Sequence, residues 1–394
     1  MTRRLEISVE RTRTKFWADN FLGVVVLLVV TASMAAAQNA SYYTKWVNYT
    51  SANGFPSGEV YCVTVDGNRV WAGTGHGLVL LEDGRIKKIF TTKDGLSGMA
   101  VMSVAVDKQT GAVWIGTFGG LSRYSGGQFT NYTNLSSGLA NDLVYGVAMQ
   151  GQYVWVATTA GVNRLDTYTG TWEIFNESNA PFEEPWTYGI SVGAEQVYFA
   201  VWGGGVLAYD LANHYWKPYT DPDGQMELVL YRNQGLIHNI VSSVSWNPDT
   251  KTFWASTYFG LSSYDGRNWH NYLKKDSGLP SNFINVVKSR GDEVWTCTQK
   301  GLSVLNTKTN TWVTYRPNTK TGHGEILLTH ADGSKQRMES ATTLAHNYIL
   351  NLDFQGDDVW VATANGLSHG MRQTAKQSLR IQHEKPAPTG GGEK

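Results

Sequence analysis

A Val-Trp pair, or a close variant of it, recurs seven times along the chain, each time followed by small or polar residues and then by Gly-Leu or Gly-Val. The second member of the pair is Trp71, Trp114, Trp155, Tyr198, Trp254, Trp295 and Trp360. Four of the six intervals between these positions are 41 or 43 residues, a period typical of a four-stranded propeller blade. One unit of this size cannot bury its own apolar face. The repeat therefore predicts an all-β chain folded as a seven-bladed β-propeller.

The same repeat assigns the four strands of each blade. An inner strand alternates apolar residues, the Val-Trp strand follows, the third strand opens with Gly-Leu, and the outer strand is aromatic, as in residues 129–132. No aromatic motif follows Leu367, yet Trp46 and Tyr49 stand before the first inner strand. We therefore expect residues 45–49 to form the outermost strand of the blade that contains Trp360. The ring would then close without an exposed sheet edge.

The two ends of the chain are expected to lie outside this propeller, which spans residues 41–370. Residues 1–37 resemble a signal peptide, with a basic start, an apolar run at 21–30 and small residues before a cleavage point after Ala37. An uncleaved membrane anchor is the alternative, because residues 21–37 carry no charge. Either reading predicts a periplasmic or extracellular protein whose contact with a membrane is limited to that anchor. Residues 371–394 are expected to form a flexible polar tail.

Composition narrows the range of partners and cross-links. Only 17% of the residues are charged and the formal net charge is zero, so the chain lacks the basic surface that binds nucleic acid. Cys62 and Cys297 occupy positions where other blades have small residues, on different strands of different blades. We expect two buried free thiols rather than a disulfide.

Residues 101–133 resemble a known repeat. Their Val-Trp-Ile-Gly-Thr, Gly-Gly-Leu-Ser-Arg-Tyr and Phe-Thr-Asn-Tyr-Thr segments, together with the Gly-Leu-Pro-Ser-Asn turn at 278–282, are similar to the two-component regulator propeller repeat. The resemblance covers roughly residues 45–370. In that family the propeller is usually the periplasmic sensor half of a membrane histidine kinase, often linked to polysaccharide utilisation. This sequence departs from the pattern, with one ring instead of two and no kinase. The resemblance therefore implies a rigid binding platform outside the cytoplasm.

A candidate binding face follows from the turns between second and third strands, which share one face of a propeller around the channel mouth. These turns vary in sequence although the rest of the repeat does not, as a recognition surface requires. The candidate residues there are His76, Phe118, Trp202, Tyr258, Phe259, Gln299, Lys300 and Asn365. Trp186 and two insertions, residues 221–235 and 320–343, are expected on the same face. The second insertion is predicted to be a hairpin that turns at Asp332-Gly333. The alternative is that the insertions are tolerated surface loops and that each ring packs on its neighbouring blade.

Two charged residues are predicted to lie inside the channel. Alignment of the inner strands places Lys288 and Asp353 at equivalent positions of adjacent blades. We expect an internal ion pair here rather than a catalytic pair.

Motifs for catalysis, metals and cofactors are not found in the sequence. The nine His residues form no His-x-x-x-His pair, and there is no Cys-x-x-Cys, Gly-x-Ser-x-Gly or phosphate-binding loop. We therefore expect no metal and no cofactor. The favoured hypothesis is an exported binding or scaffold protein that engages a protein or glycan partner. The alternative is a lyase or hydrolase of a polymeric substrate, for which His, Glu and Arg from several blades would converge at the channel mouth.

Overall fold

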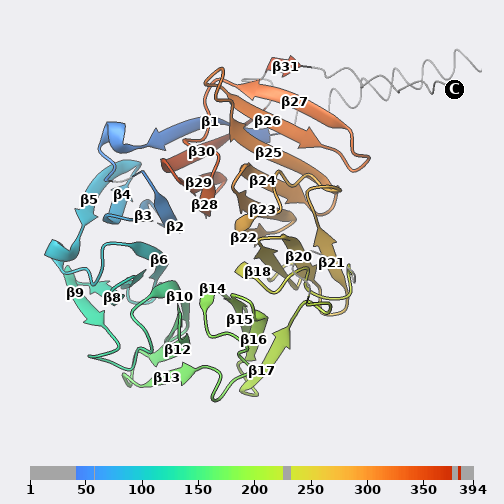
Figure 1. Cartoon of the computed structure of the whole chain (residues 1–394). Coiled ribbons are helices and arrows are strands. Elements are labelled where there is room, and N and C mark those ends of the chain that lie inside the picture. Colours follow the sequence, from blue (N-terminus) through green and yellow to red (C-terminus); the bar gives the residue numbers. More distant parts are fainter. Residues whose placement is uncertain (1–40, 57, 225–231, 375–379, 383–394) are drawn as a thin grey trace, which may run out of the picture.

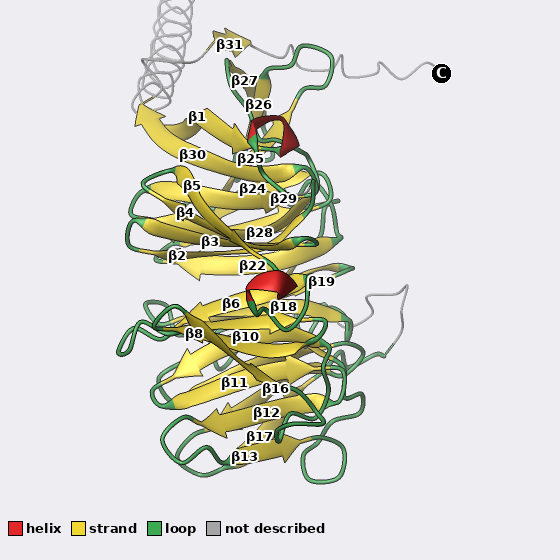
Figure 2. Ribbon diagram, turned by 90° about the vertical axis from the view of Figure 1, so that its left-hand side faces the viewer, coloured by secondary structure: helices red, strands yellow, loops and turns green. Residues whose placement is uncertain are grey.

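Seven antiparallel sheets are arranged in a ring, which confirms the predicted seven-bladed β-propeller (Figure 1). The structure is a computed structural model that describes residues 41–56, 58–224, 232–374 and 380–382. The predicted signal segment, residues 1–37, lies outside these ranges. Figure 2 shows the same ring from the side, turned by 90° from the view of Figure 1. No helix among the described residues is long and apolar enough to cross a membrane.

Six of the seven blades follow the sequence order of their strands from the channel outward. Blade one contains β2 (Val60–Asp66), β3 (Arg69–Thr74), β4 (Gly77–Glu82) and β5 (Arg85–Phe90). Blade two contains β6 (Val101–Val106), β7 (Val113–Thr117), β8 (Gly120–Ser125) and β9 (Gln128–Tyr132). Blade three contains β10 (Val144–Gln150), β11 (Tyr153–Thr158), β12 (Gly161–Asp166) and β13 (Trp172–Phe175). Blade four contains β14 (Thr187–Val192), β15 (Gln196–Val201), β16 (Gly205–Asp210) and β17 (Tyr215–Tyr219). Blade five contains β18 (Val241–Asn247), β19 (Thr252–Thr257), β20 (Gly260–Tyr264) and β21 (Trp269–Tyr272). Blade six starts with β22 (Ile284–Arg290), β23 (Glu293–Thr298), β24 (Gly301–Asn306) and β25 (Thr311–Pro317), and blade seven with β28 (Ile349–Gln355), β29 (Asp358–Thr363) and β30 (Gly366–Thr374). Short 3-10 turns, η1 (Ser51–Asn53) and η2 (Thr92–Asp94), follow two of the outer strands.

The repeated Trp or Tyr of each second strand is buried and forms the centre of the packing between blades. In five blades this ring lies 5.6–6.1 Å from the last aromatic ring of the outer strand: Trp71–Phe90, Trp114–Tyr132, Trp155–Phe175, Trp254–Tyr272 and Trp360–Tyr49. Aromatic pairs at this spacing add to the free energy of simple area burial. The two halves of the sequence repeat therefore contact each other within one blade.

The ring closes through the first described strand. β1 (Ser41–Tyr49) pairs antiparallel with β30, with Trp46 opposite Gly370, and it is the outermost strand of the sheet β1-β30-β29-β28. The pair Tyr49–Trp360 reproduces the aromatic contact of the other blades, because β1 provides the outer ring that blade seven lacks. The pairing expected from the count of strands is present.

A Thr side chain at the end of six of the seven second strands shapes the turn to the third strand. In six blades its Oγ1 donates to the carbonyl oxygen of the repeat glycine, as Thr74 does to Gly77 O at 2.9 Å. Gly77 has a φ of 119°, and a Cβ there would lie 2.2 Å from Phe90 O. Only glycine fits, so the turn has the same shape in each blade and the residues between Thr and Gly can vary.

The second insertion does not lie at the channel mouth, and this part of the expected binding face was wrong. β26 (Gly324–Thr329) pairs with β25 and β27 (Lys335–Ser340) pairs with β26, so the hairpin extends blade six outward (Figure 1). The predicted turn is present, since His330 N donates to Ser334 O and Gly333 has a φ of 82°. The outer edge of β25 offers unpaired backbone groups, and the hairpin satisfies them.

Strands continue beyond residue 370, the predicted end of the propeller. β30 continues to Thr374, four residues past the predicted boundary of the propeller. β31 (Arg380–Gln382) then pairs with β27 and completes a seven-stranded sheet in blade six. Within the predicted flexible tail, residues 371–374 and 380–382 thus belong to strands; the remaining tail residues lie outside the described ranges.

Both cysteines are buried free thiols, as the repeat alignment predicted. Burial raises the pKa of the Cys62 thiol to about 12, because a thiolate would lose its hydration there. The thiol is therefore protonated and behaves as a small apolar side chain.

Candidate functional site

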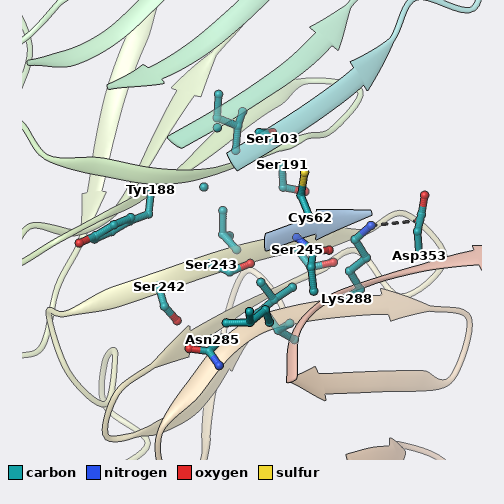
Figure 3. Close-up of a pocket in the computed structure, with 18 of the residues that line it drawn as sticks. Cys62, Ser103, Tyr188, Ser191, Ser242, Ser243, Ser245, Asn285, Lys288 and Asp353 are labelled. Carbon is teal, nitrogen blue, oxygen red and sulfur yellow. Dashed lines mark hydrogen bonds and ion pairs between the residues drawn. The ribbon is translucent and has the colours of Figure 1, made fainter. Parts of the chain in front are cut away.

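The central channel contains a cavity of about 620 Å³ whose wall consists mainly of inner strands (Figure 3). Many of its lining side chains are small and polar, including Ser103, Ser191 and Ser245. These side chains hold adjacent blades together. Three backbone N–H groups donate to a serine Oγ of the preceding blade at 2.8–3.0 Å: Val147 to Ser103, Trp246 to Ser191, and Ser289 to Ser245. The small hydroxyl groups of the channel wall thus have a structural role.

Lys288 and Asp353 form the predicted ion pair across blades six and seven. Lys288 Nζ lies 3.0 Å from Asp353 Oδ1, and Figure 3 shows the contact. The other carboxylate oxygen, Oδ2, accepts a hydrogen bond of 2.7 Å from Val65 N in blade one. Asp353 therefore links three consecutive blades at the point where the ring closes.

These contacts predict that the two members of the pair contribute unequally to stability. Lys288→Ala is expected to lower the free energy of unfolding by at most about 1 kcal/mol, because both side chains are partly exposed. Asp353→Ala also removes the acceptor of Val65 N and is expected to cost about 1–3 kcal/mol. Urea unfolding of both variants at pH 7 measures the difference. Equal losses would show that the contact with Val65 contributes nothing.

A β-bulge in each inner strand brings one further side chain to the cavity. The pairing register of every inner strand shifts at its second residue. All seven bulged residues line the cavity: Tyr61, Met102, Tyr145, Tyr188, Ser242, Asn285 and Leu350. Bulges commonly redirect a side chain at a functional rim. Tyr145 and Tyr188 are the large aromatic residues that this device places in adjacent blades three and four.

Aromatic rings from blades two to five, and from the loop that leads into blade six, form a continuous chain at the channel mouth. We call Phe118, Tyr145, Trp186, Tyr188, Trp202, Tyr258 and Phe283 the mouth arc. Its consecutive ring centroids lie 3.9–5.8 Å apart: Phe118–Tyr145 5.0 Å, Tyr145–Tyr188 4.8 Å, Tyr188–Trp186 5.8 Å, Tyr188–Trp202 5.4 Å, Trp202–Tyr258 5.1 Å and Tyr258–Phe283 3.9 Å. Trp202 N also donates to Trp186 O at 2.8 Å, which fixes two of the loops against each other.

The mouth arc is partly open to solvent and uncharged. Phe118 is 41% exposed and Trp186 is 38% exposed, although both are large apolar side chains. Burial raises the pKa of Tyr145, Tyr188 and Tyr258 above the ordinary value for tyrosine, and neighbouring tyrosines further oppose the ionisation of Tyr188 and Tyr258. The three phenols are therefore neutral at physiological pH. The arc combines apolar ring faces with hydroxyl groups beside a polar cavity.

Four of the predicted face residues, Phe118, Trp186, Trp202 and Tyr258, belong to the mouth arc. The others do not join it. Phe259 instead stacks on His238, with 4.1 Å between ring centroids. His76, Gln299, Lys300 and Asn365 are exposed on the turns of blades one, six and seven. The predicted face is thus divided into an aromatic half and a polar half.

Sequence reasoning missed Tyr145, Tyr188 and Phe283. Tyr145 and Tyr188 follow Val144 and Thr187 and precede a repeated small residue, at a position that differs from blade to blade. Sequence variation at a fixed repeat position, which identified the turn residues, was also present at this position of the inner strand. The bulge that turns this residue toward the channel depends on the pairing of strands, and for that reason it was not recognised.

The enzyme hypothesis predicted His, Glu and Arg side chains at the channel mouth. The described lining of the cavity includes Arg290 but neither His nor Glu, so it lacks the acid–base residues that the enzyme hypothesis predicted. Within the described ranges, no group of three or more His, Cys, Asp or Glu side chains is placed to hold a metal ion.

Comparisons with known proteins support the fold. No family model matches the chain, and no curated protein matches it. Among solved structures, the extracellular domain of the putative hybrid two-component system BT3049 from B. thetaiotaomicron is similar, with a TM-score of 0.63 and 18% identity over 82% of this chain and 40% of that chain. This sequence therefore spans less than half of that neighbour. In its fold, the propeller thus resembles the extracellular domain of this putative two-component system, in agreement with the sequence resemblance.

Two other neighbours show how widely the fold is used. Virginiamycin B lyase from Staphylococcus aureus has a TM-score of 0.57 and 13% identity over 83% of this chain and 97% of that chain. PorZ, a surface component of the type-IX secretion system of Porphyromonas gingivalis, has a TM-score of 0.50 and 12% identity over 88% of this chain and 40% of that chain. At these identities the likeness concerns the fold alone.

Proposed function

We propose that this protein is an extracytoplasmic binding platform that engages a protein or glycan partner through the mouth arc. The observation that carries the proposal is the continuous aromatic surface at the rim of a cavity of about 620 Å³. Large aromatic side chains are enriched at binding hot spots, and a monomeric propeller needs none at these turns. The flat faces of Trp and Tyr also stack on the apolar faces of sugar rings.

A location outside the cytoplasm agrees with two observations. Residues 1–37 have the pattern of a signal peptide, and the solved sensor domains that share the fold are extracellular domains. The rigid ring would act as a sensor or scaffold by presenting one fixed surface to its partner.

The proposal predicts a loss of binding when rings are removed from the arc. Trp202→Ala and Tyr258→Ala are each expected to weaken binding by about 2 kcal/mol, or roughly 30-fold in Kd, while the fold remains intact. The partner is first isolated from the native host with the wild-type protein, and its affinity for each purified variant is then measured by calorimetry. Protein and glycan fractions of the isolate are tested separately.

Tyr215→Ala is the matched control, because Tyr215 is 63% exposed on β17 and, among the described residues, has no ring contact with the arc. It should bind like the wild type. Unchanged affinity in the folded Trp202→Ala, Tyr258→Ala double variant would exclude the arc as the binding surface.

A further inference from the structure

The two insertions into the repeat meet at a second cavity, on the outer rim between blades five and six. Its volume is about 320 Å³. The first insertion contributes Arg232, and the second contributes the tip of its hairpin, with His330 and Lys335. The floor is formed by β21 and the loop after it, including Tyr272 and Lys274. Both insertions are additions to the repeat, so a propeller built from the repeat alone would lack this cavity.

The wall of this rim cavity is strongly basic. Four basic side chains, Arg232, Lys274, Lys275 and Lys335, line it together with one carboxylate, that of Asp276. The whole chain has a formal net charge of zero, so this is a local concentration of positive charge. Such a concave basic surface attracts and holds anions.

The single carboxylate of the wall is already neutralised. Both guanidinium nitrogens of Arg232 donate to Asp276, and one of them also donates to Asn271 O at 2.7 Å. This contact holds the pKa of Asp276 below its usual range. In contrast, Lys274, Lys275 and Lys335 have no carboxylate partner within 4.0 Å among the residues described.

Of the remaining titratable groups near the cavity, His270 adds no charge and the carboxylate of Asp332 offsets one of the positive charges. Burial and the nearby Arg232 lower the pKa of His270, so its imidazole is neutral at physiological pH. The carboxylate of Asp332, next to the cavity at the hairpin tip, accepts hydrogen bonds from Ser334 N and Oγ at 2.8 and 2.6 Å. The three lysines therefore remain the cations of the described lining without a carboxylate partner.

We propose that the rim cavity binds a multiply charged oxyanion, a phosphate or sulfate group carried by a small molecule such as a sugar phosphate. Ammonium groups donate charge-assisted hydrogen bonds to such oxygens, and these are stronger than neutral hydrogen bonds. The volume exceeds that of the bare anion and lies at the lower end of the range for small-molecule sites. Tyr272 and Thr329 also line the cavity and can contact the part of the ligand to which the phosphate or sulfate is attached. No residue of this cavity belongs to the mouth arc, so the two proposed sites can be tested, and disproved, independently of each other.

The test compares two triple variants of the full chain by calorimetric titration with a hexose 1-phosphate and with the free hexose. Lys274→Ala, Lys275→Ala, Lys335→Ala removes the rim lysines. Lys87→Ala, Lys93→Ala, Lys217→Ala removes the same charge from exposed positions of other blades. We expect saturable one-to-one binding of the phosphate ester, weakened at least tenfold in the rim variant and unchanged in the control. Equal loss in both variants, or binding that does not saturate, would overturn the proposal.

Two further arms sharpen the result. Asp276→Asn releases Arg232 toward the ligand and is expected to tighten binding several-fold, an effect that damage to the fold could not produce. Vesicles of phosphatidylglycerol and of phosphatidylcholine distinguish the source of the anion: retention on the anionic vesicles alone, lost in the rim variant, would assign the phosphate to a lipid headgroup. An Asp276→Asn variant that binds the phosphate ester no more tightly than the wild type would count against a site built around Arg232.

Discussion

Deletion of residues 41–49 is expected to abolish cooperative unfolding of the propeller. The deletion removes the whole of β1 and with it Tyr42, Tyr43 and Trp46, which are buried. It also exposes the edge of β30 and removes the ring that stacks on Trp360. Each buried aromatic side chain contributes roughly 2–3 kcal/mol, and the total stability of a domain is only about 5–15 kcal/mol. The loss is therefore comparable with the whole free energy of folding.

Thermal unfolding followed by near-ultraviolet circular dichroism measures this effect. Truncation after Thr374 is the control, because it removes a strand that pairs at only three positions of β27. That variant should retain a single sharp transition. A β1-deleted protein with an unchanged melting transition would disprove the role of β1 in closing the ring.

Trp155→Ala is expected to destabilise the propeller strongly. Trp155 is 0% exposed, and its ring lies 5.4 Å from Phe199 and from Tyr209, and 6.0 Å from Phe175. Removal of such a ring leaves a cavity between blades three and four and costs about 3–5 kcal/mol. Trp155→Phe keeps a ring in this space and is expected to lose much less.

Trp186→Ala provides the matched control, because the same side chain is removed from a position that is 38% exposed at the channel mouth. We expect its free energy of unfolding to change by less than about 1 kcal/mol. Urea unfolding of the three variants decides the matter: similar losses for Trp155→Ala and Trp186→Ala would mean that the repeated Trp is no more important for packing than a surface ring.

The sequence was sufficient for the architecture and for contacts that repeat in every blade. The period of the Val-Trp motif predicted seven blades, and the unmatched Trp46 and Tyr49 predicted the closing strand. The ion pair of Lys288 and Asp353 also followed from alignment of the inner strands, since the repeat places equivalent residues at the same height in adjacent blades. These predictions succeeded because each blade has the same local surroundings.

The site could be predicted only in part. Phe118, Trp202 and Tyr258 were recognised because they vary at a fixed position of the turns, whereas Tyr145 and Tyr188 connect them into one surface and were not recognised. Strand residues alternate in direction, but a bulge interrupts this alternation, and the bulge is formed by the pairing of two strands. Periodicity along one strand therefore could not show which way these rings point.

The placement of the insertions shows the same division. The sequence alone determined that residues 320–343 form a hairpin, because the alternating pattern and the Asp332-Gly333 turn are local. Only the tertiary structure decided that this hairpin adds to the outer edge of β25, away from the channel mouth, and that its tip meets Arg232 at the rim cavity. Local sequence specifies turn and strand through backbone conformation and side-chain alternation. The choice of neighbour depends on which unpaired sheet edge lies within reach, and that edge exists only once the blades have been assembled.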